Sequence, residues 1–317
     1  MRLFENTNID FLGKRHIFYI VSISVIVIGM VVLAFRGIPL GIDFLGGTEM
    51  QLKFSNPVNV SEVRSLMDNN GFSGMEIKTM GSPTDLLLRT PMQAEGTVVA
   101  DKIKEVLTQK YGQSNTFQVQ RTDKVGPKIG SELRRNALLA VLFSLLGILI
   151  YLAIRFQFVY ALGAVIALFH DVLITISAIA LFDALLPIQL EFSQTMLAAF
   201  LTLIGFSVND TVIIFDRIRE NIKLHKNEDI EQVMNRSVNA TLSRTIITSG
   251  TVFLTVLVIF IFGGEVLRSF SFTFGVGIIT GTYSSVFVAS AIVVDWKHKV
   301  LKNKSTSGSS KLVESKI

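Results

Sequence analysis

The sequence predicts a polytopic α-helical membrane protein with six transmembrane helices and one extracytoplasmic α+β domain of the ferredoxin-like type. The composition is the first observation: 50% of the 317 residues are hydrophobic, 17% are charged and the mean hydropathy is +0.51, which is too apolar for a soluble chain. The second is a set of six apolar stretches, each long enough to cross ~30 Å of hydrocarbon. The third is a polar stretch of roughly a hundred residues, about one small domain, between the first two of them.

The six apolar stretches are the predicted membrane spans. The first follows Lys14 and Arg15 in the manner of a signal peptide, but its uncharged run is long and no small-residue cleavage pattern follows it, so we expect an uncleaved anchor. The predicted spans are Ile17–Phe35, Ala137–Ile154, Phe158–Phe182, Phe192–Phe215, Thr245–Gly264 and Ser269–Val294.

The distribution of Lys and Arg in the short loops predicts the orientation. The segments after the fourth and sixth spans are rich in these residues, and the segment after the second carries Arg155. The loop from Asp183 to Glu191 has none, and the other short outer loop has only Arg268. Arg134 and Arg135 oppose the rule, but they flank a long translocated domain, where charge counts little. Both termini are therefore expected in the cytoplasm, and the domain between the first two spans outside it.

The composition also excludes several classes of function. The net charge of +5 comes largely from Lys and Arg beside the apolar spans, where topology explains them, so no nucleic-acid partner is expected. The chain has no cysteine, which excludes disulfides and thiolate-bound metals, and its four His show no metal-binding spacing. We expect no cofactor and no metal.

Residues 36–136 form the predicted extracytoplasmic domain. Alternating residues predict strands, and the helices between them have start and stop signals such as Asn59 and Gly71. The resulting order, βαββαβ, is that of the ferredoxin-like split. The expected elements are a strand over Glu49–Phe54, a helix from Asn59 to Gly71, strands over Met75–Met80 and Asp85–Thr90, a helix over about Thr97–Tyr111 and a strand over Thr116–Thr122.

Three polar segments complete the predicted organisation around a bundle over 137–294. Residues 1–16 are a cytoplasmic N-terminus, and residues 295–317, rich in Lys and Ser, are a disordered tail. The loop over 216–243 has apolar residues at loosely helical spacing. It is either a helix lying along the inner membrane surface or an ordinary solvated connector.

An acidic residue interrupts the fourth span. Asp210 lies in a segment otherwise apolar enough to cross a bilayer. A charged group in hydrocarbon costs at least ~2.5 kcal/mol on insertion scales, so it is rarely there without a partner and a task. Asp210 is the leading candidate for a functional residue, and it indicates a membrane protein that moves charge.

Arg244 lies at the mouth of the fifth span, at a depth similar to that of Asp210 on the preceding antiparallel helix. We expect the two to form an ion pair, with Asn209 and Thr248 adding hydrogen bonds. Protonation of Asp210 would neutralise the partner of Arg244 and change the favoured helix packing, which would couple proton entry to helix movement. The alternative is a static ion pair that only fixes the helix register.

A second acidic residue, Asp171, lies near the middle of the third span beside His170. It is interpreted either as a proton relay or as a residue facing a polar cavity near the outer side. His170 is interpreted as a packed neighbour rather than a relay.

Two glycine-rich segments have structural interpretations. Gly275, Gly277 and Gly281 include a Gly-xxx-Gly pair that would let helices approach closely. The segment Gly41–Gly47 (GIDFLGG) follows the first span and is expected to form a glycine turn leading into a strand. Its structural residues are Gly41, Asp43, Gly46 and Gly47.

Several motifs together resemble the SecF branch of the SecD/SecF family of protein-export membrane proteins, within the resistance-nodulation-division superfamily. The resemblance covers nearly the whole chain, with only the polar tail left out. The residues that carry it are Gly41–Gly47 (GIDFLGG), Val125–Pro127, Val208–Thr211 (VNDT), Phe215–Asn221 (FDRIREN) and Ser243–Thr245.

The resemblance implies a function in protein export and not an enzyme. It implies a bacterial cell (inner) membrane location, a separate SecD partner, association with the SecYEG channel, contact with preproteins and possible further Sec accessory proteins. Members of the family use the proton-motive force on preproteins after the ATP-driven motor SecA has acted. The family's proton-conducting aspartate falls on Asp210, its transmembrane arginine on Arg244 and the polar residue one turn later on Thr248.

Two other classes of function fit the sequence less well. A proton-coupled exporter of small molecules or lipids, from the same superfamily, usually carries much larger external domains than this one. An intramembrane aspartyl protease would need two Asp at matched depth, whereas Asp171 and Asp210 are expected at different depths, and no GxSG motif suggests a serine protease.

Overall fold

The computed structural model describes residues 7–91, 97–186 and 190–299. The chain forms two compact units, which we call the helix unit and the sheet unit. The helix unit comprises Met1–Phe35, Phe143–Ile179 and Ala199–Ile317, and the sheet unit comprises Arg36–Leu142 and Ala180–Ala198.

Within the described part of the chain, six helices are long and apolar enough to cross a membrane, as the sequence predicts. The first begins with a short 3₁₀ turn, η1 (Leu12–Lys14), and the last continues through a π-helical turn, η2 (Ser285–Ala289), to Lys299. The helices are α1 (Arg15–Arg36), α5 (Pro127–Arg155), α6 (Phe158–Leu185), α7 (Gln194–Leu224), α8 (Ile230–Phe262) and α9 (Gly264–Ser284).

The segment over 216–243 is mostly helical: it forms the end of one long helix and the start of the next, with residues 225–229 between them. Helix α7 continues to Leu224 and α8 begins at Ile230, where the Asp229 side chain caps its first turn. The physical reason is packing: the apolar residues of this segment extend the core of the helix unit. Those that are buried are Ile218, Val233, Met234 and Val238.

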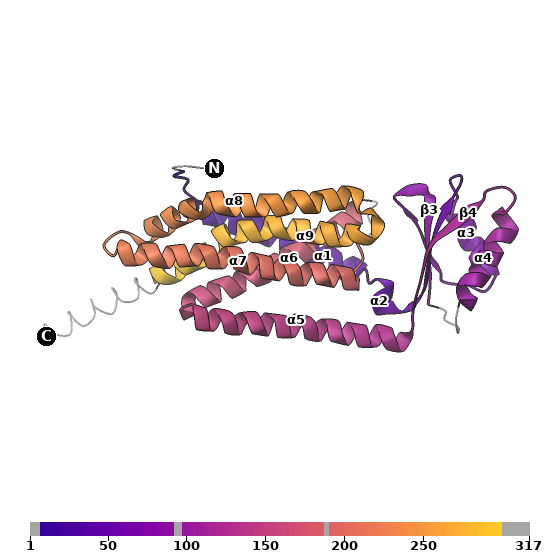
Figure 1. Ribbon diagram of the computed structural model, residues 1–317, viewed down its shortest axis with the longest axis horizontal. Coiled ribbons are helices and arrows are strands. Elements are labelled where there is room, and N and C mark those ends of the chain that lie inside the picture. Colours follow the sequence, from indigo (N-terminus) through magenta and orange to yellow (C-terminus); the bar gives the residue numbers. More distant parts are fainter. Residues whose placement is uncertain (1–6, 92–96, 187–189, 300–317) are drawn as a thin grey trace. The chain divides into compact units, whose positions relative to one another are not determined.

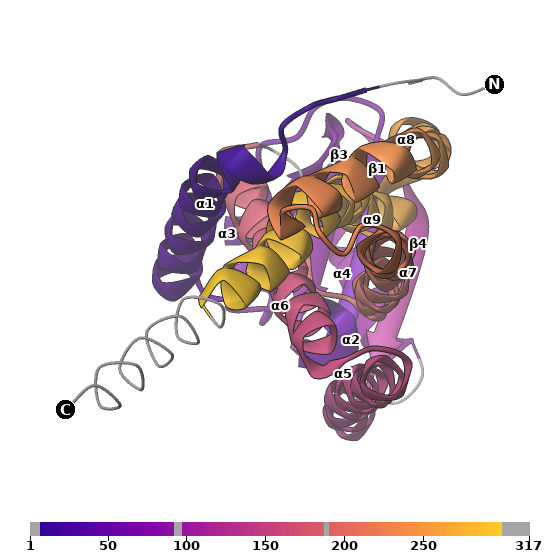
Figure 2. The ribbon, with the colours of Figure 1, turned by 90° about the vertical axis from the view of Figure 1, so that its left-hand side faces the viewer.

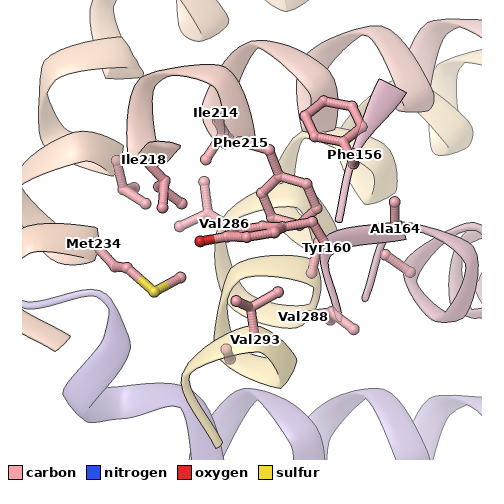
Figure 3. Close-up of a cluster of buried hydrophobic side chains, with 14 of the residues drawn as sticks. Phe156, Tyr160, Ala164, Ile214, Phe215, Ile218, Met234, Val286, Val288 and Val293 are labelled. Atoms are coloured by element: carbon pink, nitrogen blue, oxygen red, sulfur yellow. The ribbon is translucent and has the colours of Figure 1, made fainter. Parts of the chain in front are cut away.

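Phe215 lies at the centre of the core of the helix unit. Its ring packs edge-on against Tyr160, with centroids 5.2 Å apart, and against Phe156 at 5.9 Å. Figure 3 shows these three rings with Ile218 and Val286 around them. Burying one such side chain contributes roughly 1.5–3 kcal/mol, so this cluster fixes the rotation of α7 about its axis.

Small residues bring α9 close to α7. A Cβ on Gly277 would lie 2.5 Å from Leu203 Cδ1, and one on Gly281 would lie 3.0 Å from Ser207 Cβ. The predicted Gly-xxx-Gly packing is thus present, formed by these two glycines. Figures 1 and 2 show α9 beside α8 as well, so α7, α8 and α9 meet in one region of the bundle.

The sheet unit contains the predicted βαββαβ order. Its four strands are antiparallel neighbours in the order β2-β3-β1-β4, which is the ferredoxin-like arrangement. The elements are β1 (Gly47–Phe54), α3 (Val60–Asn69), β2 (Glu76–Met80), β3 (Ser82–Thr90), α4 (Val98–Tyr111) and β4 (Phe117–Val125).

Alternation along the strands gives the sheet one apolar face. Met50 and Leu52 on β1 and Leu88 on β3 point to the side that α3 and α4 cover, where they form the core of this unit (Figure 1). The Asn59 side chain caps α3 by accepting a hydrogen bond from the Ser61 N–H at 2.9 Å, as the sequence predicts.

The glycine segment forms a short helix, α2 (Ile42–Leu45), and then enters β1. Gly46 and Gly47 have φ of 76° and 124°, values that other residues rarely adopt. A Cβ on Gly47 would also lie 2.4 Å from the Thr90 carbonyl oxygen. The predicted glycine turn is therefore present, and Gly47 is needed both for its backbone angle and for close approach of β3.

The last helix extends beyond the predicted span. Residues 295–299 are helical, so the predicted tail does not begin at 295. Residues 300–317 lie outside the described part of the chain.

Candidate functional site

One stripe along α7 faces the interior of the helix unit. Its members recur every three or four residues, which is the spacing of one helical face. Each is at most 2% exposed, so polar and apolar members alike are removed from solvent. The stripe consists of Ser207, Asp210, Thr211, Ile214, Phe215 and Ile218.

Asp210 is held by hydroxyl groups from two other helices. Ser249 on α8 donates a hydrogen bond to Asp210 Oδ2 at 3.1 Å, and Thr282 on α9 donates to Ser249 Oγ at 2.8 Å. One residue further along α7, the hydroxyls of Thr211 and Ser285 lie 2.9 Å apart. The carboxyl group therefore lies at the junction of three helices, and each helix contributes a polar side chain.

The predicted ion pair between Asp210 and Arg244 is not formed among the described residues. Arg244 is exposed, whereas Ser249 on the same helix is buried against Asp210. Five residues separate the two, a rotation of about 140° beyond a full turn at ~3.6 residues per turn, so they lie on different sides of α8. The Arg244 charge still acts on the Asp210 carboxyl group, but from beyond ion-pair distance. Sequence spacing placed Arg244 at the right level but could not give the rotation of the helix.

The side chains of Thr248 and Asn209, which were expected to add hydrogen bonds to the ion pair, also point elsewhere. The Thr248 hydroxyl donates to the carbonyl oxygen of Arg244 at 2.9 Å and to that of Thr245 at 3.0 Å, so it bonds to its own helix and not to Asp210. Asn209 is exposed, on the side of α7 away from the buried stripe. Of the predicted proton-pathway residues, the structure buries Asp210 and Asp171 and leaves Asn209, Arg244 and Thr248 on outer surfaces of the helix unit.

Asp171 on α6 lies in a second polar cluster next to the first. Ser207 donates a hydrogen bond to Asp171 Oδ2, and His170 Nδ1 lies 3.0 Å from Asp171 Oδ1. Both residues of the α6 pair are buried, at 1% exposed for Asp171 and 8% for His170. Ser207 is three residues before Asp210 on the buried stripe, so a single turn of α7 separates the two acidic sites.

His170 is more than the packed neighbour that the sequence suggested. Its Nε2 lies 2.8 Å from the Ser22 hydroxyl on α1, and that hydroxyl contacts the Tyr283 hydroxyl on α9. Tyr283 in turn donates to the Phe18 carbonyl oxygen at 3.0 Å. A continuous chain of polar contacts thus runs from α6 to α1 and α9.

The residues that sequence reasoning missed are mostly hydroxyl-bearing. Ser22, Ser207 and Ser249 contact the acidic groups or His170, and none was predicted to do so. Ser and Thr are common in membrane helices, so the available signal was their helical spacing relative to the two Asp residues. The π-helical turn η2, which carries Ser285, has no sequence signature, although such turns often occur at functional sites.

The glycine segment is bonded to the start of α7. Asp43 Oδ2 accepts a hydrogen bond from the Gln194 N–H at 2.8 Å, and the Gly41 N–H donates to the Phe192 carbonyl at 2.8 Å. Gly46 and Gly47 shape the turn that follows. This segment therefore acts structurally, within the sheet unit.

Comparisons with known proteins agree on one family. Residues 98–299 match the profile of "Protein export membrane protein SecD/SecF, C-terminal", and residues 31–58 match the "SecD/SecF GG Motif". The chain is 45% identical to the protein translocase subunit SecF of Rhodothermus marinus over 93% of this chain and 95% of that one. It is 34% identical to the same subunit of Helicobacter pylori strain 26695, over 93% of this chain and 89% of that one.

Solved structures give the same result. The crystal structure of SecDF from Thermus thermophilus, described as a translocon-associated membrane protein, matches with a TM-score of 0.81 and 35% identity. The match covers 92% of this chain but 39% of that one, so this chain spans about two fifths of the SecDF chain. SecDF in a super-membrane-facing form matches with a TM-score of 0.69 and 34% identity, over 96% of this chain and 41% of that one.

Proposed function

The chain belongs to the SecD/SecF family of protein-export membrane proteins, and from that membership we propose that it uses proton movement through its helix unit to drive polypeptide export. It is a multi-pass membrane protein and an accessory component of Sec protein translocation. The proposal adds the energy source, the residues and the partners: a SecD subunit, the SecYEG channel and a preprotein that has already passed the SecA-driven step.

The burial of Asp210 is the observation that carries the proposal. Its carboxyl group is 1% exposed, and in the described part of the chain its direct polar partner is a neutral hydroxyl, with no cation within ion-pair distance. An ionised carboxylate in such a place costs at least ~2.5 kcal/mol on insertion scales. One charge crossing 100 mV supplies about 2.3 kcal/mol, so a membrane potential is large enough to shift the balance between the two protonation states.

The contacts of Asp210 indicate how a change of charge would move helices. Its ionised form accepts the hydrogen bond from Ser249 and so holds α8 against α7, while Thr282 extends the link to α9. A hydrogen bond to a charged group is worth about 1.5–3 kcal/mol, more than one to a neutral group. Protonation therefore weakens the junction of the three helices and favours a second packing of the bundle.

Asp171 on α6 is proposed as a second proton station. Its carboxyl group lies beside His170, and Ser207 links it to the turn of α7 that precedes Asp210. A proton leaving Asp171 has a hydroxyl-bearing residue on its path toward Asp210. The resulting order of stations is Asp171, Ser207 and Asp210.

The exposed polar residues of α7 and α8 indicate where a SecD partner binds. Arg244 lies exposed on a membrane helix, where an uncovered charge carries a cost, and Asn209 and Thr248 are exposed as well. A second helix-rich subunit that supplies polar groups would remove this cost. We assign these outer residues to the SecD interface and place the complex in the bacterial inner membrane with both termini in the cytoplasm.

Replacement of Asp210 by Asn tests the proposal. The protein, with its SecD partner and the channel, is reconstituted in proteoliposomes, and export is measured with and without an imposed proton gradient. Asp210→Asn is nearly isosteric and should preserve folding and co-purification with SecD but abolish the stimulation of export by the gradient.

The matched control is Asp216→Asn on the same helix, whose side chain is 40% exposed and paired with Arg155 at 2.6 Å. This variant should retain the stimulation. Full gradient-driven export by Asp210→Asn would reject the proposed function.

A further inference from the structure

A buried ion-pair network lies on the face of the sheet opposite α3 and α4. The strand register aligns Glu76, Arg89 and Glu49 in one row across β2, β3 and β1. This face would be open to solvent if only the two helices covered the sheet, yet Arg89 is 6% exposed and Glu49 is 8% exposed. Something else in the sheet unit therefore covers the row.

The cover comes from the segment that leads into α7. Glu191 reaches Arg89 and forms an ion pair with its Nη2 atom, while Arg89 Nη2 and Nε lie 2.5 and 2.9 Å from Glu49 Oε2. Glu76 Oε2 lies 3.2 Å from Arg89 Nη1, and Lys78 Nζ lies 3.5 Å from Glu191 Oε1. The guanidinium thus joins both strands that flank β3 to a segment 102 residues away in the chain.

Arg89 remains positively charged in this network. Burial alone would lower its pKa, but hydrogen bonds and charge from Glu191 and Glu49 outweigh burial and raise the pKa above the ordinary value. A guanidinium also presents several N–H groups in a fixed plane, so it can hold three carboxylates in a defined geometry.

Two further contacts bind residues 191–194 to the segment from Pro39 to Asp43. Residues Leu40 and Phe192 form a parallel bridge, with the Phe192 N–H donating to the Pro39 carbonyl at 2.7 Å. Asp43 then accepts the Gln194 N–H at 2.8 Å, and Gln194 is the first residue of α7. An ion pair, a backbone bridge and a hydrogen bond to the first residue of α7 therefore act on three of the four consecutive residues 191–194.

We propose that the contacts of residues 191–194 with Arg89, Leu40 and Asp43 form a rigid joint that transmits displacement of α7 to the sheet. The inference rests on the proposed function, because it concerns what proton binding at Asp210 moves. Gln194 and Asp210 belong to the same continuous helix, sixteen residues or ~24 Å apart at ~1.5 Å per residue. A displacement of α7 along its axis reaches residues 191–194 undiminished, and the joint passes it to β3 and β1.

Glu191→Ala is the variant that loosens the joint. It removes the only side chain among residues 191–194 that binds Arg89 in the described structure, and it leaves Asp210 and its contacts unchanged. Proton uptake by Asp210, followed by infrared spectroscopy of the complete complex, should be unaltered, while gradient-driven stimulation of export should fall severalfold. Glu105→Ala, at an exposed position on α4, is the control and should change neither.

A disulfide across the parallel bridge provides a rescue that a purely structural role would not predict. The chain has no cysteine, so Leu40→Cys with Phe192→Cys introduces a single pair at neighbouring bridge positions. In the Glu191→Ala background, the oxidised pair should restore gradient-driven export and its reduction should remove it again.

Several outcomes would contradict the proposal that residues 191–194 form a rigid joint. Normal gradient-driven export by Glu191→Ala would show that the ion pair transmits nothing, and so would a failure of the disulfide to restore export. If Glu191→Ala does not fold, the Leu40→Cys/Phe192→Cys disulfide is tested in an otherwise unchanged chain. Gradient-driven export should then continue in the oxidised protein, because a rigid joint does not need to open. A block of export by the disulfide would contradict the proposed joint. Loss of proton uptake in the unchanged protein would instead reject the proposed function.

Discussion

Asp210 combines an ionisable group with a buried position where three helices meet. It is buried among hydroxyl groups from two other helices, and the same face of α7 carries Phe215 in the apolar core. The rings around Phe215 fix the rotation of the helix, so Asp210 cannot turn away from Ser249 without disrupting the core. In the proposed function, a change in its protonation state is accommodated by movement of the neighbouring helices.

At the same scale, the sequence was sufficient to find Asp210 but not its partner. A carboxylate in an apolar stretch is visible without a structure, because its cost in hydrocarbon is independent of its neighbours. The choice between Arg244 and Ser249 depends on the rotation of α8, which packing determines. The His170–Ser22 contact joins residues 148 positions apart, and no local pattern encodes such a pair.

The carboxylates around Arg89 provide a prediction for pH. Burial raises the pKa of Glu49 above its ordinary 4.5, although the charge of Arg89 opposes this. Burial also acts to raise the pKa of Glu76, but hydrogen bonding and charge from Lys78 outweigh it and lower the pKa below 4.5. On acidification, Glu49 should therefore take up a proton above pH 4.5 and Glu76 below it.

The contributions of the two groups to the free energy of unfolding consequently change with pH in opposite directions. The folded state binds a proton at Glu49 more tightly than the unfolded chain, so this contribution is present below pH 4.5 and is lost as the pH rises through the raised pKa. The contribution of Glu76 is present above pH 4.5 and is lost as the pH falls through its lowered pKa. Carbon-13 NMR of labelled Glu, with Glu49→Gln and Glu76→Gln for assignment, measures the order in which the two carboxylates take up protons as the pH is lowered. Protonation of Glu76 at a higher pH than Glu49 would contradict the prediction.

At the scale of elements, helix packing is set by small residues at points of contact. The backbones of α1 and α6 approach closely at Gly29, where an added Cβ would lie 2.2 Å from Ser177 Cβ and 2.5 Å from Ser177 Cα. The Ser177 backbone cannot move aside as a flexible side-chain end could. The same approach brings Ser22, earlier on α1, within reach of His170.

Gly29→Ala should therefore destabilise the helix unit by ~1–3 kcal/mol, the usual cost of overpacking. Gly250→Ala on α8 is the matched control, because no atom lies within 4 Å of its added Cβ. That change should be neutral or stabilising by up to about 1 kcal/mol, since Ala is the better helix former. Thermal unfolding in detergent measures both, and equal stability of the two variants would contradict the packing argument.

Sequence patterns predicted the elements better than their ends. Apolar length identified each membrane helix, and alternation with caps identified the strands and helices of the sheet unit. The segment over 216–243 has the helical spacing that the sequence indicates, and its apolar residues continue the inner stripes of α7 and α8. Amphipathic continuations of a membrane helix and separate surface helices have the same periodicity, so the pattern alone cannot distinguish them.

At the scale of the whole molecule, α7 is shared by the two units. Its first residues are held by the sheet unit through Asp43 and the 191–194 segment, and its later residues carry Asp210 in the helix unit. The sequence predicted both parts and the turn between them. The long-range contact of Glu191 with Arg89 could not be predicted, because strand register and loop path are both needed to bring the two together.

The central claim is that Asp210 binds and releases a proton as the gradient acts on the complex. Infrared difference spectroscopy of the protein with its SecD partner in native lipid measures this directly, with Asp210→Asn used to assign the carboxyl band. The account predicts a protonated carboxyl band that appears and disappears reversibly as the pH on one side of the membrane is changed. A carboxyl group at Asp210 that stays in one protonation state over the whole accessible pH range would contradict it.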